Sequence, residues 1–173
     1  LPIEIKDKAA INMGHIRSKC RALHRQKKCG MVIIDYLQLI AESSNGQRNR
    51  EQEISRMSRE AKIIAKELNI PVILLSQLNR EVDKRQDKKP ILADLRESGA
   101  IEQDADMVIF VHRPEYYGIS LKDSSGNEIE NYGELIIAKH RNGAVGMVKF
   151  KHNGSLTKIF DYDTKGYLKQ PPF

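Results

Sequence analysis

The sequence has 173 residues, with 29 Lys and Arg against 23 Asp and Glu, which gives a formal net charge of +6. Hydrophobic residues make up 40% and charged residues 30%, which excludes an intrinsically disordered chain and is typical of a globular domain. No apolar run is long enough to span a membrane. The mild basic excess permits a polyanionic partner such as nucleic acid without requiring one. Cys20 and Cys29 lack metal-ligand spacing, so we expect a reduced, cytoplasmic protein.

The first half of the sequence alternates between helical and strand patterns. Residues 14–28 show apolar positions at helical spacing, and the unalternated apolar run 31–34 predicts a strand buried on both faces, closed by Asp35. The polar stretch 43–50 predicts a loop. A long helix follows, whose apolar face we predict to consist of Ile54, Met57, Ala61, Ile64 and Leu68.

That helix is predicted to end at Asn69, before Pro71 opens a second buried strand, 72–75, which is followed by Ser76 and Gln77. A third apolar run covers residues 107–111. Towards the end of the chain, the Asn142-Gly143 pair lies between two strand-like runs and predicts a hairpin. Strands alternating with helices indicate an α/β fold with helices flanking the sheet, here finishing in antiparallel hairpins.

Polar residues at strand ends are the candidate site, because ligands of open α/β sheets bind outside the carboxyl ends of the strands. Asp35 could hold Mg²⁺ through its water shell, since Mg²⁺ keeps several waters and takes few carboxylates, or it could simply cap the next turn. Gln77 could sense a terminal phosphate or orient a water, or be a solvated strand end. Both alternatives stay open from the residues alone.

A basic pair, Lys139 and Arg141, alternates along a later strand, so the two side chains are predicted to share a face. A guanidinium held by the tight turn after Arg141 suits stabilisation of a transferring phosphate, including one bound to a neighbouring subunit. The alternative is an exposed basic strand end.

Three blocks in order resemble the DnaB family of replicative DNA helicases. They are GMVIIDYLQLI (30–40), the run SQLNREVDKR (76–85) with KPILADLRESGAIEQDAD (89–106), and IIAKHRNGAVG (136–146). The third block departs from the usual form, which has Gln in place of His140. The resemblance extends from about Leu1 to Tyr162.

The resemblance implies a RecA-like, mostly parallel sheet flanked by helices, in a homo-hexameric ring that uses ATP and Mg²⁺ to move along single-stranded DNA. Asp35 is similar to the magnesium-associated aspartate, and Gln77 to the polar sensor between phosphate and DNA loops. Lys139 and Arg141 resemble the pair that reaches a neighbouring subunit's site, with Arg141 as arginine finger. A primase and a helicase loader are implied as partners.

DNA contacts are also implied by the resemblance. Arg96, Glu97 and Gly99 match the loop that touches the DNA backbone, and a glycine with a backbone N–H can approach a phosphate closely. Glu97 would act differently, by orienting Arg96 or by bonding a neighbouring subunit. Arg48 and Arg50 lie in a loop that the family places toward the central channel.

One expected motif is missing. No Gly-rich GxxxxGK[ST] sequence occurs in the 173 residues, and the chain begins at Leu1-Pro2 without Met. We therefore expect residues 1–173 to be a partial C-terminal RecA-like ATPase domain whose phosphate-binding part lies upstream, and we expect the isolated fragment to be inactive. Two alternatives are a recombination or repair ATPase of the RecA or RadA kind, and a non-catalytic DNA-binding or assembly module. The block DLRESGAIEQDAD speaks against the recombinase.

Overall fold

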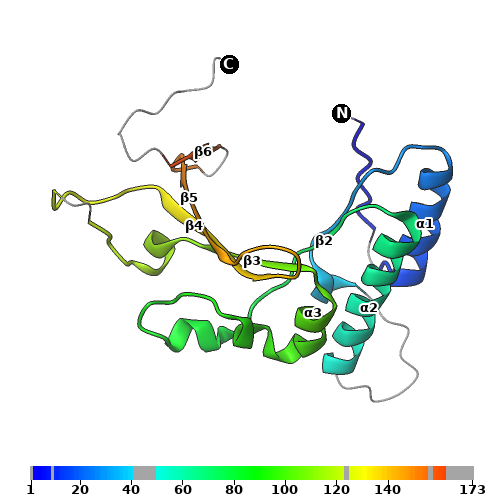
Figure 1. The fold of residues 1–173 in the computed structure, drawn as a ribbon, viewed down its shortest axis with the longest axis horizontal. Coiled ribbons are helices and arrows are strands. Elements are labelled where there is room, and N and C mark those ends of the chain that lie inside the picture. The colour runs from blue at the N-terminus through cyan, green and yellow to red at the C-terminus, as the bar shows by residue number, and fades with distance from the viewer. Residues whose placement is uncertain (1, 9, 41–49, 123–124, 156–157, 163–173) are drawn as a thin grey trace. The chain divides into compact units, whose positions relative to one another are not determined.

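The computed structural model describes residues 2–8, 10–40, 50–122, 125–155 and 158–162 (Figure 1). These residues belong to two compact units, the first formed by 1–79 with 93–105 and the second by 80–92 with 106–173. The helices of the first unit are α1 (Met13–Arg25), α2 (Arg50–Leu68) and α3 (Gly99–Asp104), and its strands are β1 (Val32–Ile34) and β2 (Val72–Leu74). The strands of the second unit are β3 (Met107–His112), β4 (Tyr132–His140), β5 (Gly146–His152) and β6 (Ile159–Asp161).

The core of the first unit forms where α1 and α2 pack on one face of the β1–β2 pair. All five positions predicted for the apolar face of α2 are buried. They join a cluster completed by Met13, Cys20, Ile34, Leu37, Ile40 and Ile101. Asn69, directly after α2, has the left-handed φ of 51° that commonly ends a helix. The predicted helix and its stop are therefore confirmed.

The prediction that both early strands are buried on two faces is wrong for the described part of the chain. Ile33 of β1 is 62% exposed and Ile73 of β2 is 44% exposed. The inward residues Ile34 and Leu74 pack against the helical cluster, whereas the opposite face is left open among the described residues. The apolar runs 31–34 and 72–75 correctly predict strands, but an apolar run does not indicate which elements cover each face of the strand.

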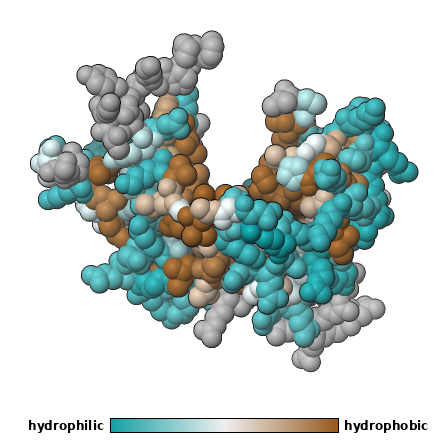
Figure 2. All heavy atoms as spheres, in the orientation of Figure 1, coloured by the Kyte–Doolittle hydropathy of each residue, from teal (hydrophilic) through white to brown (hydrophobic). Residues whose placement is uncertain are grey.

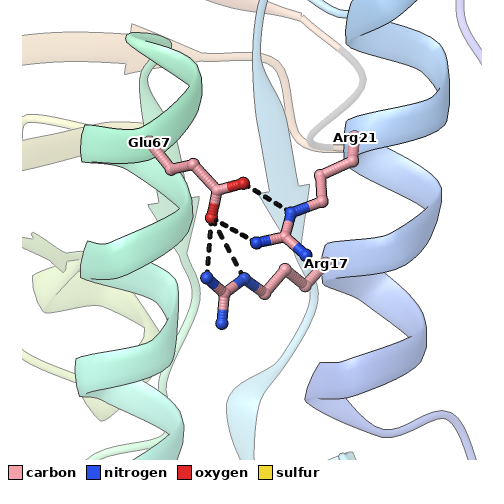
Figure 3. A network of polar contacts seen from close by, with 3 residues as sticks. All are labelled: Arg17, Arg21 and Glu67. Atoms are coloured by element: carbon pink, nitrogen blue, oxygen red, sulfur yellow. Dashed lines mark hydrogen bonds and ion pairs between the residues drawn. The ribbon is translucent and has the colours of Figure 1, made fainter.

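Two arginines of α1 bind one carboxylate of α2. Arg17 donates to Glu67 at 2.7 Å, and Arg21 donates to the same group at 2.5 and 2.9 Å (Figure 3). The hydrogen bonds from Arg21 and Arg17 lower the pKa of Glu67 from 4.5 to about 2. Arg17 and Arg21 therefore connect α1 to α2 through Glu67.

We expect Glu67→Gln to lower the melting temperature by a few degrees at pH 7, because it removes the charge from this contact. A carboxyl whose pKa falls on folding stabilises the protein above its unfolded pKa, and the contribution is lost as pH falls from about 4.5 toward 2. Thermal unfolding at several pH values should show the gap between wild type and variant narrowing below pH 4.5. The control is Glu130→Gln at an exposed position. A gap that stays constant from pH 7 to pH 3 would contradict this role.

The second unit is an antiparallel sheet in the order β3-β4-β5-β6. The predicted hairpin around Asn142-Gly143 is confirmed as β4–β5, although neither residue has the positive φ of a two-residue turn, and residues 141–145 connect the strands. Gly133 of β4 faces Phe150 of β5, whose ring would lie 2.2 Å from any added Cβ. Met147 and Val148 of β5 remain exposed, and Figure 2 shows hydrophobic surface in the region of β4 and β5.

A buried charged cluster joins β3 and β4 in this unit. The Glu134 carboxylate accepts from Lys89 at 2.9 Å and from the Tyr132 hydroxyl at 2.8 Å, and lies 3.3 Å from Nδ1 of His112. Burial raises the pKa of Glu134, but the bonds from Lys89 and Tyr132 outweigh it and the pKa lies below its ordinary value. A buried carboxylate is tolerated here because its partners supply the hydrogen bonds that water would provide.

The prediction of an α/β fold that finishes in antiparallel hairpins is confirmed. Within the described residues, parallel pairing is limited to β1 and β2, and β3 pairs antiparallel with β4.

Candidate functional site

Asp35 and Gln77 lie at the same edge of the parallel pair. β1 and β2 run side by side with Ile34 opposite Leu74, so the residues that follow the two strands emerge together. The Asp35 and Gln77 side chains are both exposed. The structure thus brings together the two strand-end residues that the sequence singled out, while their chemical roles stay predictions.

Backbone hydrogen bonds continue beyond both strands and fix the segment that carries Asp35. The Leu75 N–H donates to the Ile34 carbonyl, and the Leu37 N–H donates to the Leu75 carbonyl, each at 2.9 Å. Leu37 itself is fully buried and opens a short 3₁₀ turn, Leu37–Leu39. Asp35 is therefore presented to solvent from a segment that is anchored on both sides.

Sequence reasoning missed Gln38, which connects the two strand ends. Its side-chain amide donates to Oγ of Ser76 at 3.0 Å and to the carbonyl of Gln77 at 3.3 Å. Its side-chain oxygen accepts from the Gln77 N–H at 3.3 Å. Only its place in the block DYLQ, three residues after Asp35, could have drawn attention to it, since no periodicity marks the contact.

Arg50, predicted to contact DNA, opens α2 and makes two contacts within the chain. Nη2 donates to the Gln38 carbonyl at 2.5 Å, and Nη1 pairs with Glu53 at 2.8 Å. The side chain is still 45% exposed. Its DNA contact stays a prediction, and Arg48 lies outside the described residues.

The basic pair belongs to the second unit. Lys139 is the last but one residue of β4, and Arg141 follows the final residue of that strand. The Arg141 N–H donates to the Asp106 carbonyl at 2.8 Å, and Nη1 pairs with the Asp106 carboxylate at 2.9 Å. Both side chains of this ion pair are about half exposed. Asp106, which sequence reasoning did not assign, therefore contacts Arg141 through both its backbone and its side chain.

The predicted DNA loop follows a buried anchor in the first unit. Asp94 and Leu95 are buried, and the Asp94 carbonyl accepts from the Asn79 N–H at 3.0 Å. The backbone then runs through the 3₁₀ segment Leu92–Ser98 to Gly99, which opens α3 and is exposed. The side chains of Arg96 and Glu97 lie outside the described residues, so their roles stay predictions.

A metal at this site would have to rely on few protein ligands. In the described part of the chain, no three His, Cys, Asp or Glu side chains are grouped so that they could hold an ion. One exposed carboxylate, Asp35, fits Mg²⁺ bound chiefly by water and phosphate oxygens, which needs only one or two carboxylates. None of the helices described is long and apolar enough to cross a membrane.

The fold is that of a RecA-like α/β domain, as the comparison with solved structures shows. The pattern of the DnaB-like helicase C terminal domain family matches residues 1–161, and the chain belongs to this family. Its sequence is 52% identical over 147 residues to the replicative DNA helicase DnaB of Geobacillus stearothermophilus, covering 85% of this chain and 31% of that protein. It is 44% identical to the replicative DNA helicase DnaB of Rickettsia conorii, covering 94% and 35%.

Solved structures agree with the sequence relatives. One of them, described as an ATPase domain, superposes with a TM-score of 0.79 at 42% identity, over 91% of this chain and 54% of that one. A DnaB-like replicative helicase, described together with its interactions with primase, superposes with a TM-score of 0.80 at 42% identity, over 92% and 38%. The chain spans about a third of the length of the curated relatives it matches.

Proposed function

We propose that these residues form the larger part of the motor domain of a replicative DNA helicase, which hydrolyses ATP, moves along single-stranded DNA as a homo-hexameric ring and unwinds duplex at the fork. Family membership supports the helicase class. The observation that carries the motor chemistry is the parallel pairing of β1 and β2, which places Asp35 and Gln77 at one edge. The carboxyl edge of such a sheet is where ligands bind.

In this proposal ATP and Mg²⁺ are the cofactors, and the Gly-rich phosphate-binding loop is not supplied by residues 1–173, whose sequence contains no GxxxxGK[ST] motif. Mg²⁺, when bound, neutralises charge on the phosphate oxygens. Asp35 holds its water shell, and Gln77 responds to the terminal phosphate. Lys139 and Arg141 act on the nucleotide of the neighbouring subunit, where the planar, permanently charged Arg141 guanidinium stabilises the transferring phosphoryl group.

DNA and protein partners follow from the same proposal. The path of single-stranded DNA is lined by Arg96, Glu97 and Gly99, together with Arg48 and Arg50. The formal charge of +6 is compatible with a polyanionic ligand. A primase and a helicase loader are the protein partners, and the protein works in the cytoplasm.

Unwinding by the full-length protein tests this function. We expect it to separate a forked duplex with ATP and Mg²⁺ and to stay inactive with a non-hydrolysable analogue. The 173-residue chain alone should not turn over ATP, because its sequence contains no Gly-rich GxxxxGK[ST] loop to cradle the phosphates. DNA binding without nucleotide turnover would favour a non-catalytic module instead. Strand exchange without unwinding would favour a recombinase.

A further inference from the structure

The side-chain amide of Gln38 forms hydrogen bonds with both the backbone N–H and the backbone carbonyl of Gln77. Its oxygen accepts from the Gln77 N–H, while its nitrogen donates to the Gln77 carbonyl and to the Ser76 hydroxyl. Among uncharged side chains, only an amide offers an acceptor and two donors in one plane. These contacts fix the backbone from which the Gln77 side chain projects, but leave that side chain exposed.

Gln38 is itself held in place from its main chain. The Arg50 guanidinium donates to the Gln38 carbonyl, and Glu53 holds Arg50 from the other side. The preceding residue, Leu37, is buried and bonded to the Leu75 carbonyl. The Gln38 amide therefore projects from a fixed point, so that its direction is set by the first turn of α2 and by the core.

We propose that Gln38 is a positioning residue for ATP hydrolysis, which sets the backbone of Gln77 and ties it through Arg50 to the first turn of α2. This inference rests on the proposed function, in which Gln77 responds to the terminal phosphate. Gln38 acts through Gln77 and does not touch the nucleotide. Because catalytic groups must be placed within a fraction of an ångström, a displaced Gln77 lowers the rate of turnover more than the binding of ATP.

The test uses steady-state ATPase kinetics of the full-length protein on single-stranded DNA. In Gln38→Ala, and in Gln38→Glu, which keeps the acceptor but loses both amide donors, we expect kcat to fall about 10- to 100-fold. The KM for ATP should stay within about twofold of the wild-type value, because Gln38 does not contact ATP and the contacts that bind ATP in the ground state are unchanged. Thermal melting establishes that each variant is folded. If Gln38→Ala does not fold, the kcat of Gln38→Glu alone tests the inference. The matched control, Gln52→Ala, changes an exposed glutamine of α2 and should behave as wild type.

A double-mutant cycle separates positioning from a general structural role. If Gln38 acts through Gln77, adding Gln38→Ala to Gln77→Ala should lower kcat no further. Losses that multiply, or kcat within about twofold of wild type in folded Gln38 variants, would overturn the inference. Failure of the wild-type protein itself to hydrolyse ATP would instead overturn the proposed function, so the two failures are distinguishable.

Discussion

Replacing Arg141 by Ala in the full-length protein should lower the ATPase rate about 10³- to 10⁵-fold, the range typical of an arginine finger. Binding of a fluorescent ATP analogue should be nearly unchanged, because the side chain stabilises the transferring phosphoryl group rather than the ground state. Arg141→Lys should recover little activity, since an ammonium group lacks the planar fork of donors. Phosphate release sampled at fixed times measures the ATPase rate, and parallel titrations with the fluorescent analogue measure its binding.

The ion pair with Asp106 supplies the critical control for this prediction. Arg141 could be needed only because it pairs with Asp106. In that case Asp106→Asn, which breaks the ion pair but keeps the backbone bond, should reproduce the full loss. If the finger assignment holds, Asp106→Asn should retain most of the turnover. Equal losses in the two variants would contradict a direct role for Arg141.

The second large effect is expected at Asp35. Asp35→Asn preserves the size of the side chain and one acceptor oxygen, but it replaces the other oxygen by a donor and removes the charge that would hold the metal's water shell. A metal ion contributes several kcal/mol to stabilising transition-state charge, so turnover should fall about 10²- to 10³-fold, with a higher Mg²⁺ concentration needed for half-maximal rate. Because Asp35 is exposed, its loss should leave the melting temperature nearly unchanged.

Magnesium titrations of the ATPase rate measure this effect, with Asp161→Asn at an exposed position of β6 as the matched control. The control should show the wild-type Mg²⁺ dependence. An Asp35→Asn variant with wild-type kcat and Mg²⁺ dependence would show that Asp35 only caps the turn after β1.

Much of the fold could be predicted because local patterns decide it. The buried face of α2 follows from apolar residues at helical spacing, and the stop at Asn69 follows from a residue that tolerates positive φ. The edge that carries Asp35 and Gln77 follows from the rule that parallel strands end together. These features depend on neighbours in the sequence, so one sequence suffices to predict them.

The remaining features depend on contacts between residues distant in the chain. Gln38 and Gln77 are 39 residues apart, and Asp106 and Arg141 are 35 apart, so no spacing rule links either pair. The exposed faces of Ile33 and Ile73 depend on which elements cover the sheet, which an apolar run does not specify. The position of Asp35 and Gln77 at one edge of the parallel pair was thus predictable from strand geometry, but the contacts that support them were not.

Mixed rings test the central claim most directly, because the proposal requires that each active site draws Asp35 from one subunit and Arg141 from the next. Asp35→Asn and Arg141→Ala proteins should each be nearly inactive alone. After verified subunit exchange, some interfaces would carry both intact residues, and DNA-stimulated ATPase activity should reappear in proportion to those interfaces. Mixed rings that exchange subunits but never regain activity would contradict the shared site.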